Sequence, residues 1–152
     1  MSAAKYLMYL TGLSTYALMV WGAYVTLGGY GLGCGTFWPT CNGAIFPLLD
    51  WPTFVEYFHR LLTIVTGVLL VVSTLLVWKM RPRPVGPSRA MALAIILLFV
   101  QSLLGGDVVV TSLDPITTTL HLAFATAVFA TIVVACVLMY SLEKSTISRS
   151  SL

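Results

Sequence analysis

His59 and His121 are the two histidines of this 152-residue chain, and they are its strongest candidates for chemistry. Each falls inside a long apolar stretch, where an ionisable side chain is costly and normally faces the interior of a helix bundle or a cavity. At 1.5 Å per residue, His59 lies about 12 Å beyond Trp51 and His121 about 9 Å beyond Pro115. Their similar depth predicts that two imidazoles from different helices meet in one plane, as they do when a bundle ligates haem iron on both faces.

The residues around His59 favour a ligand site. Glu56 lies three residues earlier on the same helical face, and Thr63, Thr66 and Gly67 continue that face with small or hydroxyl-bearing groups that leave room for a flat molecule. The carboxylate of Glu56 is expected to act as an acid or base, or to accept a hydrogen bond from a hydroxyl. Near His121, the same kinds of side chain recur at 117, 118 and 125.

Arg60 has two interpretations. Its guanidinium can pair with a haem propionate near the outer interface, or it can reach the lipid headgroups. The two histidines also have a simpler interpretation, in which each makes an interhelical hydrogen bond and binds nothing. Their matched depth, with Glu56 and Arg60 beside one of them, favours a shared haem or metal. A haem is favoured over nonhaem iron, because two histidines and one carboxylate more often form the facial triad of a soluble protein.

Cys34 and Cys41 lie in one short loop on the side of the membrane expected to be oxidising. This placement favours a disulfide or a redox-active pair. A zinc site is the alternative, but no nearby histidine completes its ligand set. Cys136 lies deep in a late apolar stretch and is expected to be a small apolar filler.

The elements that position these residues are membrane helices. With 59% hydrophobic and 9% charged residues, the chain is unlike a soluble domain. Four stretches are long enough to cross about 30 Å of hydrocarbon, at residues 6–27, 52–78, 90–110 and 116–140. The sequence therefore predicts an all-α, four-helix transmembrane bundle that forms a single domain over residues 1–152. The first stretch is expected to be a retained helix, since it is longer than the apolar core of a signal peptide.

Basic residues set the expected orientation, because short loops rich in lysine and arginine stay in the cytoplasm. The central loop at 79–89 carries four of them, and Lys5 and Lys144 lie near the two ends. Both termini are therefore expected inside, and the loop at 28–51 outside. The net charge of +3 reflects this topology and does not indicate nucleic-acid binding.

The central loop divides the chain into two helical pairs that look weakly alike. Each pair begins with an outward-going helix that ends near Leu-Gly-Gly, at 27–29 and 104–106, and each returns through a helix with a histidine near its outer end. The pattern predicts a pseudo-two-fold axis along the membrane normal.

Four motifs in order resemble the haem A synthase family: residues 31–34 (GLGC), 38–43 (WPTCNG), 56–60 (EYFHR) and 104–111 (LGGDVVVT), followed by His121. The resemblance implies conversion of haem O to haem A, with haem b as cofactor, in a prokaryotic plasma membrane. It implies that Glu56 is the catalytic acid, that His59 and His121 ligate haem iron, and that Cys34 and Cys41 are the loop cysteine pair.

The resemblance covers a single bundle, whereas familiar members have two bundles in one chain. We therefore expect identical copies to associate, so that one holds haem b and another haem O, and haem O synthase is a possible partner. The alternative is a b-type haem protein that transfers electrons or handles haem without catalysis. A small transporter is not favoured, because no helix is interrupted at mid-membrane.

Overall fold

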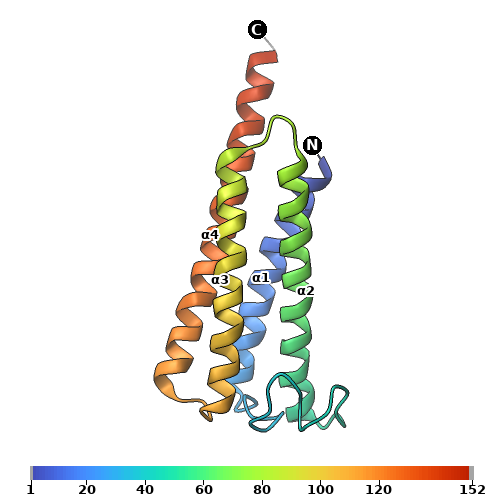
Figure 1. Ribbon diagram of the computed structural model, residues 1–152, viewed down its shortest axis with the longest axis vertical. Helices are drawn as coiled ribbons and strands as arrows, with labels where there is room; N and C mark the ends of the chain where they lie inside the picture. Colours follow the sequence, from blue (N-terminus) through green and yellow to red (C-terminus); the bar gives the residue numbers. More distant parts are fainter. Residues whose placement is uncertain (1, 151–152) are drawn as a thin grey trace.

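The computed structural model describes residues 2–150 as four long helices: α1 (Ser2–Leu27), α2 (Trp51–Lys79), α3 (Val85–Val110) and α4 (Pro115–Ser150). All four are long and apolar enough to cross a membrane. They run alternately up and down, and both described ends of the chain lie at the same end of the bundle as the 80–84 loop (Figure 1). The long loop after α1 covers the opposite end, here called the outer end, which confirms the predicted all-α transmembrane bundle.

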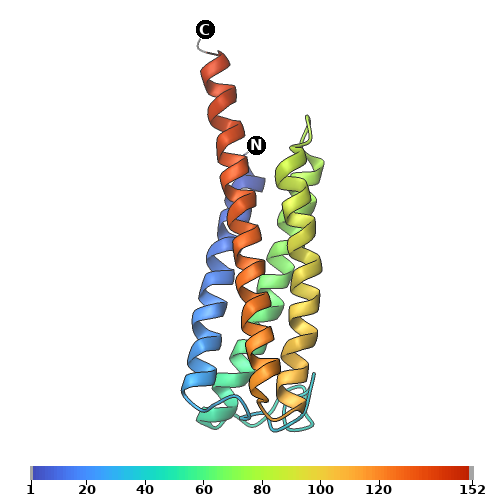
Figure 2. The ribbon, with the colours of Figure 1, turned by 90° about the vertical axis from the view of Figure 1, so that its left-hand side faces the viewer.

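The bundle is a square of helices in chain order. Within the described residues α1 packs on α2, α2 on α3, α3 on α4 and α4 on α1, while the pairs α1/α3 and α2/α4 lie across the diagonals. Figure 2 shows α4 extending beyond the other helices at the inner end. The two histidine-bearing helices, α2 and α4, therefore face each other across the bundle axis.

The apolar core is concentrated in the inner half of the bundle. All four helices contribute to it, with its largest buried side chains at Met8, Leu70, Met91 and Ile132. In the outer half, the interior contains polar groups and the two histidines, and the loop after α1 closes the end. The inner half therefore holds the helices together, and the outer half carries the candidate site.

Three helix boundaries lie several residues from the sequence prediction. α1 begins at Ser2 rather than at 6. α3 begins at Val85 rather than at 90, so the expected loop of 79–89 shrinks to 80–84. Pro87 falls within the first turn of α3, where backbone N–H groups have no intrahelical acceptor, so a proline is tolerated. α4 runs on to Ser150 rather than ending at 140, because no glycine or proline follows Tyr140.

The Leu-Gly-Gly repeat is not structurally equivalent in the two halves. Gly28 and Gly29 lie beyond the end of α1, and Gly29 has a φ of 75°, which favours glycine. Gly105 and Gly106 instead lie within α3. The predicted correspondence between these glycines is therefore wrong. A different pair of glycines relates the two halves, as described below.

Candidate functional site in the outer half of the bundle

His59 of α2 and His121 of α4 both lie in the outer half of the bundle. Each imidazole is seated against a glycine of the preceding helix. A Cβ atom added at Gly22 of α1 would lie 2.9 Å from Cε1 of His59, and one added at Gly105 of α3 would lie 3.0 Å from Cε1 of His121. Gly22 and Gly105 are thus the structurally equivalent residues of the two halves, and both rings present the same edge to their neighbouring helix.

The two imidazoles differ in their hydrogen bonds. Nε2 of His121 lies 3.2 Å from Nε2 of Gln101 on α3. For His59, no bond to either ring nitrogen occurs within residues 2–150, and Nδ1 of each histidine is buried without a partner. Buried polar atoms without partners are uncommon and call for an explanation, such as a ligand. The sequence analysis did not single out Gln101, although an amide inside an apolar stretch was the available signal.

α1 also fixes the helical turn that carries His59. The indole of Trp21 donates a hydrogen bond to the backbone oxygen of Val55, 3.0 Å away, and its ring packs edge-on against Phe58. Val55 lies one turn before His59, so this contact and Gly22 together set the position of His59 relative to α1. Neither Trp21 nor Gly22 was predicted as a site residue, because their role depends on interhelical packing.

Glu56 is buried beneath the outer loop, with 3% of its surface exposed. One carboxylate oxygen accepts a hydrogen bond from the backbone N–H of Cys34 at 2.8 Å, and the other is paired with Arg60. Arg60 also donates to three loop carbonyls, those of Phe37, Pro39 and Thr40. Glu56 and Arg60 therefore attach the loop to α2, an arrangement that neither interpretation of Arg60 had included.

Further contacts hold the loop on the first turns of α2. The hydroxyl of Thr53 donates to the carbonyl of Gly33, and the hydroxyl of Tyr57 donates to the carbonyl of Ile45. Asp50 caps the helix by accepting a hydrogen bond from the N–H of Thr53 at 3.1 Å, and its contacts with Thr53 lower the pKa of Asp50.

Cys34 and Cys41 are joined as a disulfide, with their Cα atoms 4.4 Å apart, and both are fully buried. The Cys34 N–H donates to Glu56, so the cysteine pair and the carboxylate belong to one cluster. At the other edge of the loop, the ring of Trp38 lies on Gly106 of α3, where an added Cβ would come within 2.8 Å. The loop therefore spans from α2 to α3 above the histidines.

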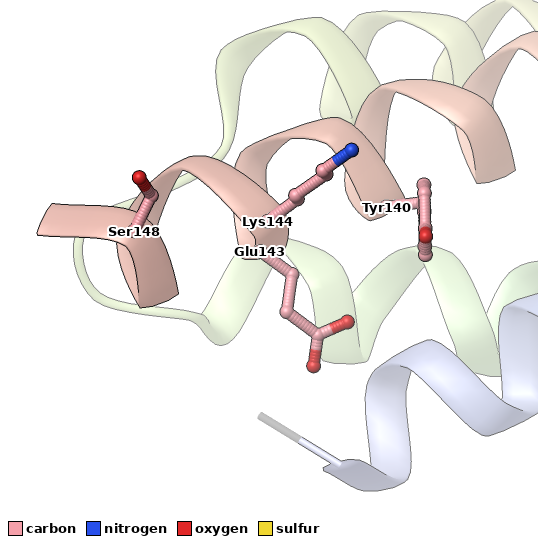
Figure 3. Close-up of a pocket in the computed structure, with 4 residues that line it drawn as sticks. All are labelled: Tyr140, Glu143, Lys144 and Ser148. Carbon is pink, nitrogen blue, oxygen red and sulfur yellow. The ribbon is translucent and has the colours of Figure 1, made fainter. Parts of the chain in front are cut away.

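A separate hollow lies at the inner end and is lined by Tyr140, Glu143, Lys144 and Ser148 (Figure 3). Glu143 is directed toward α1, where it forms an ion pair with Lys5 at 2.6 Å. This hollow is at the opposite end from the histidines. Cys136 is half-buried in α4, and its thiol contacts the backbone oxygen of Met8.

The arrangement of His59 and His121 fits the binding of a haem. Two imidazoles approach from diagonally opposite helices, each has a buried ring nitrogen without a partner, and each lies against a glycine that leaves the ring free of a neighbouring side chain. Helical bundles ligate haem with such side chains from facing helices. Among the described residues no cluster of three or more metal-binding side chains occurs, which leaves the histidine pair as the candidate.

The chain has relatives among known proteins. The chain matches the family described as cytochrome oxidase assembly protein, COX15-CtaA, over residues 5–151. It is 30% identical to a protein named heme A synthase from Bacillus licheniformis over 148 residues, which are 97% of this chain and 49% of that protein. It is also 30% identical to a heme A synthase from Bacillus pumilus, where the match covers 94% of this chain and 47% of that protein. The identity to a heme A synthase from Bacillus mycoides is again 30%, and the match covers 96% of this chain and 47% of that protein.

The chain thus spans about half the length of the curated relatives it matches. No solved structure matches it. Its four spanning helices and its bacterial relatives make it a multi-pass prokaryotic membrane protein. With nearly all of its length matched, the chain belongs to the COX15-CtaA family of cytochrome oxidase assembly proteins.

Proposed function

We propose that this chain binds haem between His59 and His121 and takes part in haem A synthesis, the oxidation of a methyl group of haem O to the formyl group of haem A. The observation that carries the proposal is the pair of imidazoles on diagonally opposite helices, each with an unpartnered ring nitrogen and each against a glycine. The proposal is supported by relatives that are named heme A synthase.

His59 and His121 would hold the iron of a haem b cofactor or of the haem O substrate, one from α2 and one from α4. When bound, the haem iron supplies the redox chemistry, and the protein supplies binding, orientation and electrostatics. Gly22 and Gly105 would set the position of each imidazole, and the loop after α1 lies over the outer end of the bundle.

Glu56 is the proposed proton-handling group, because it is a buried carboxylate one helical turn from His59. Both of its oxygens accept hydrogen bonds in this structure, from Arg60 and from the N–H of Cys34. Each oxygen keeps a further lone pair that can take a proton, so these two partners hold the carboxylate in place without using all of its acceptor sites. The Cys34–Cys41 pair is therefore proposed to act on the reaction through the loop that holds Glu56.

The same contacts favour a second function, that of a b-type haem protein without catalysis. If the task of Glu56 is to hold the loop, its two hydrogen bonds account for its burial without any part in a reaction. Replacement of Glu56 by glutamine separates the two functions. The amide keeps the shape, and its oxygen can still accept the Cys34 N–H, but its NH2 group cannot accept from Arg60 and it cannot take up a proton.

The test is to coexpress variants with a source of haem O and to identify the extracted pigments by mass. We expect Glu56→Gln to retain bound haem and to lose haem A, whereas His59→Ala and His121→Ala lose the haem. Glu143→Gln is the matched control, because it removes a carboxylate at the far end of the bundle. Full haem A output from Glu56→Gln would refute catalysis by this residue, and full haem content in both histidine variants would refute the haem site.

We also propose that a second copy of the chain supplies the second haem site, since the relatives are about twice as long as the matched region. Haem O synthase is a further proposed partner, as the supplier of the substrate. Cross-linking in native membranes, with haem counted per chain, tests the association. A strictly monomeric, active protein that holds one haem would contradict it.

A further inference from the structure

Four buried polar side-chain atoms lack a hydrogen-bond partner in the part of the chain described, and they belong to His59, Gln101, Thr118 and His121. Three of these residues lie on α3 and α4. Thr118 is one turn from His121 on the same helix, and the amide of Gln101 contacts the His121 ring. The unsatisfied atoms therefore gather around the histidines, mostly on one side of the bundle.

Interior hydroxyl groups farther from the outer end are satisfied. Thr11 donates to Ser73 across α1 and α2 at 3.2 Å, and Ser14 and Thr66 share a hydrogen bond of 2.8 Å. In these pairs, the interior hydroxyl groups between α1 and α2 form hydrogen bonds with one another, as is usual for polar groups in a packed interior. Gln101 differs, because its side chain is only partly satisfied. Its Nε2 lies against His121, whereas its Oε1 is buried without a hydrogen-bond partner, and the residue is 9% exposed.

The two halves of the bundle make this difference clear. Gln101 lies four residues before Gly105, one helical turn toward the inner end, and the residue at the same spacing before Gly22 is Leu18. The His121 half thus has an amide where the His59 half has an apolar side chain. The amide reaches Nε2 of His121, and no equivalent hydrogen bond is made to His59 among the described residues.

We propose that Gln101 is a positioning residue for His121 that occupies its Nε2 nitrogen before haem is bound. This inference rests on the proposed haem function. Nε2 has one lone pair in the neutral ring, so it either accepts the amide N–H of Gln101 or binds iron. Ligation of iron through Nε2 of His121 therefore requires the Gln101 contact to break, whereas no such contact is made to Nε2 of His59 among the described residues.

The exchange is balanced in its bonds. The hydrogen bond between the amide and Nε2 breaks, the Nε2 lone pair binds iron, and no electron or proton leaves the protein. The amide of Gln101 then turns to a different partner, for which the unpartnered hydroxyl of Thr118 is available. It follows that His59 ligates first and His121 second, and that Gln101 sets the rate of the second step.

The test mixes purified haem-free protein in detergent with ferric haem b and follows the optical spectrum in time. A five-coordinate, high-spin species reports the first histidine, and a six-coordinate, low-spin species reports the second. Gln101→Leu, with Gln101→Met as a second variant of similar volume, should speed the second step by about fivefold, the factor expected for one hydrogen bond. Leu18→Gln, which places an amide beside His59, should slow the first step by a similar factor.

Ser102→Ala is the matched control on α3, because its hydroxyl bonds the Leu98 carbonyl of its own helix. It should leave both steps unchanged. If Gln101 had a purely structural role, the second ligation step would become slower instead of faster. Both Gln101 variants would then be less stable and would bind haem more slowly or more weakly. An unchanged or slower second step, with normal haem binding, overturns the inference alone. Failure of the unmodified protein to reach a six-coordinate state overturns the proposed function as well.

Discussion

Replacement of Gly22 by alanine should displace His59 and weaken haem binding. The new methyl group would lie 2.9 Å from Cε1 of the imidazole, closer than carbon atoms normally approach, so the ring must move. Such overpacking costs about 1–3 kcal/mol. In an unhindered helix the same substitution instead stabilises by roughly 0.5–1 kcal/mol.

The chain offers a matched control for this substitution on the same helix. A Cβ atom at Gly12 of α1 would meet Ile132 at 3.6 Å, which is an ordinary contact. Gly12→Ala should therefore be neutral or stabilising. If the free-energy cost at Gly22 is a cost of haem ligation, the haem dissociation constant should rise by about fivefold to 150-fold relative to this control.

Haem titration by absorbance and thermal unfolding of the haem-free protein measure the two effects separately. We expect Gly22→Ala to bind haem more weakly than Gly12→Ala, and Gly105→Ala, with a contact of 3.0 Å, to show a smaller effect of the same sign. If Gly22→Ala binds haem as tightly as Gly12→Ala, then the glycine does not set the position of His59, and the reasoning from close packing is refuted.

Two further predictions concern the loop. Hydrogen bonds from Thr53 lower the pKa of Asp50, so the stabilisation by this cap is present above the ordinary pKa and is lost as pH falls through the lowered value. The protection factor of the amides in the first turn of α2, which corrects the exchange rate for its intrinsic pH dependence, should stay constant from pH 7 to pH 5 and fall below about pH 4. Asp50→Asn should abolish this change, and an unchanged profile would contradict the role of the carboxylate. Arg60→Met should speed amide exchange in the outer loop while His59 still ligates haem, because Arg60 bonds loop carbonyls; haem loss with an unchanged loop would instead favour a propionate contact.

The helices were predictable because apolar length alone identifies a membrane span, and basic loops set its orientation. The residues at which the helices begin and end were less predictable. Pro87 indicated a loop, yet a proline in the first turn of a helix displaces no hydrogen bond. Polar residues after Tyr140 likewise gave no sign of how far α4 continues beyond the membrane.

In the candidate site, ionisable residues at membrane depth were identifiable by type, so His59, His121 and Glu56 stood out. Their partners did not, since a partner is defined by contacts between helices. Gly22 looks like any membrane-helix glycine until His59 packs against it, and Gln101 becomes notable through its contact with His121.

The concentration of the apolar core in the inner half has a mechanical consequence. There the side chains of Met8, Leu70, Met91 and Ile132 pack the four helices together, whereas the histidines lie near the opposite end. A small separation of the α1–α2 pair from the α3–α4 pair at the outer end would leave this inner core intact. A molecule bound by both histidines would connect the two pairs, and its binding free energy would stabilise the closed bundle.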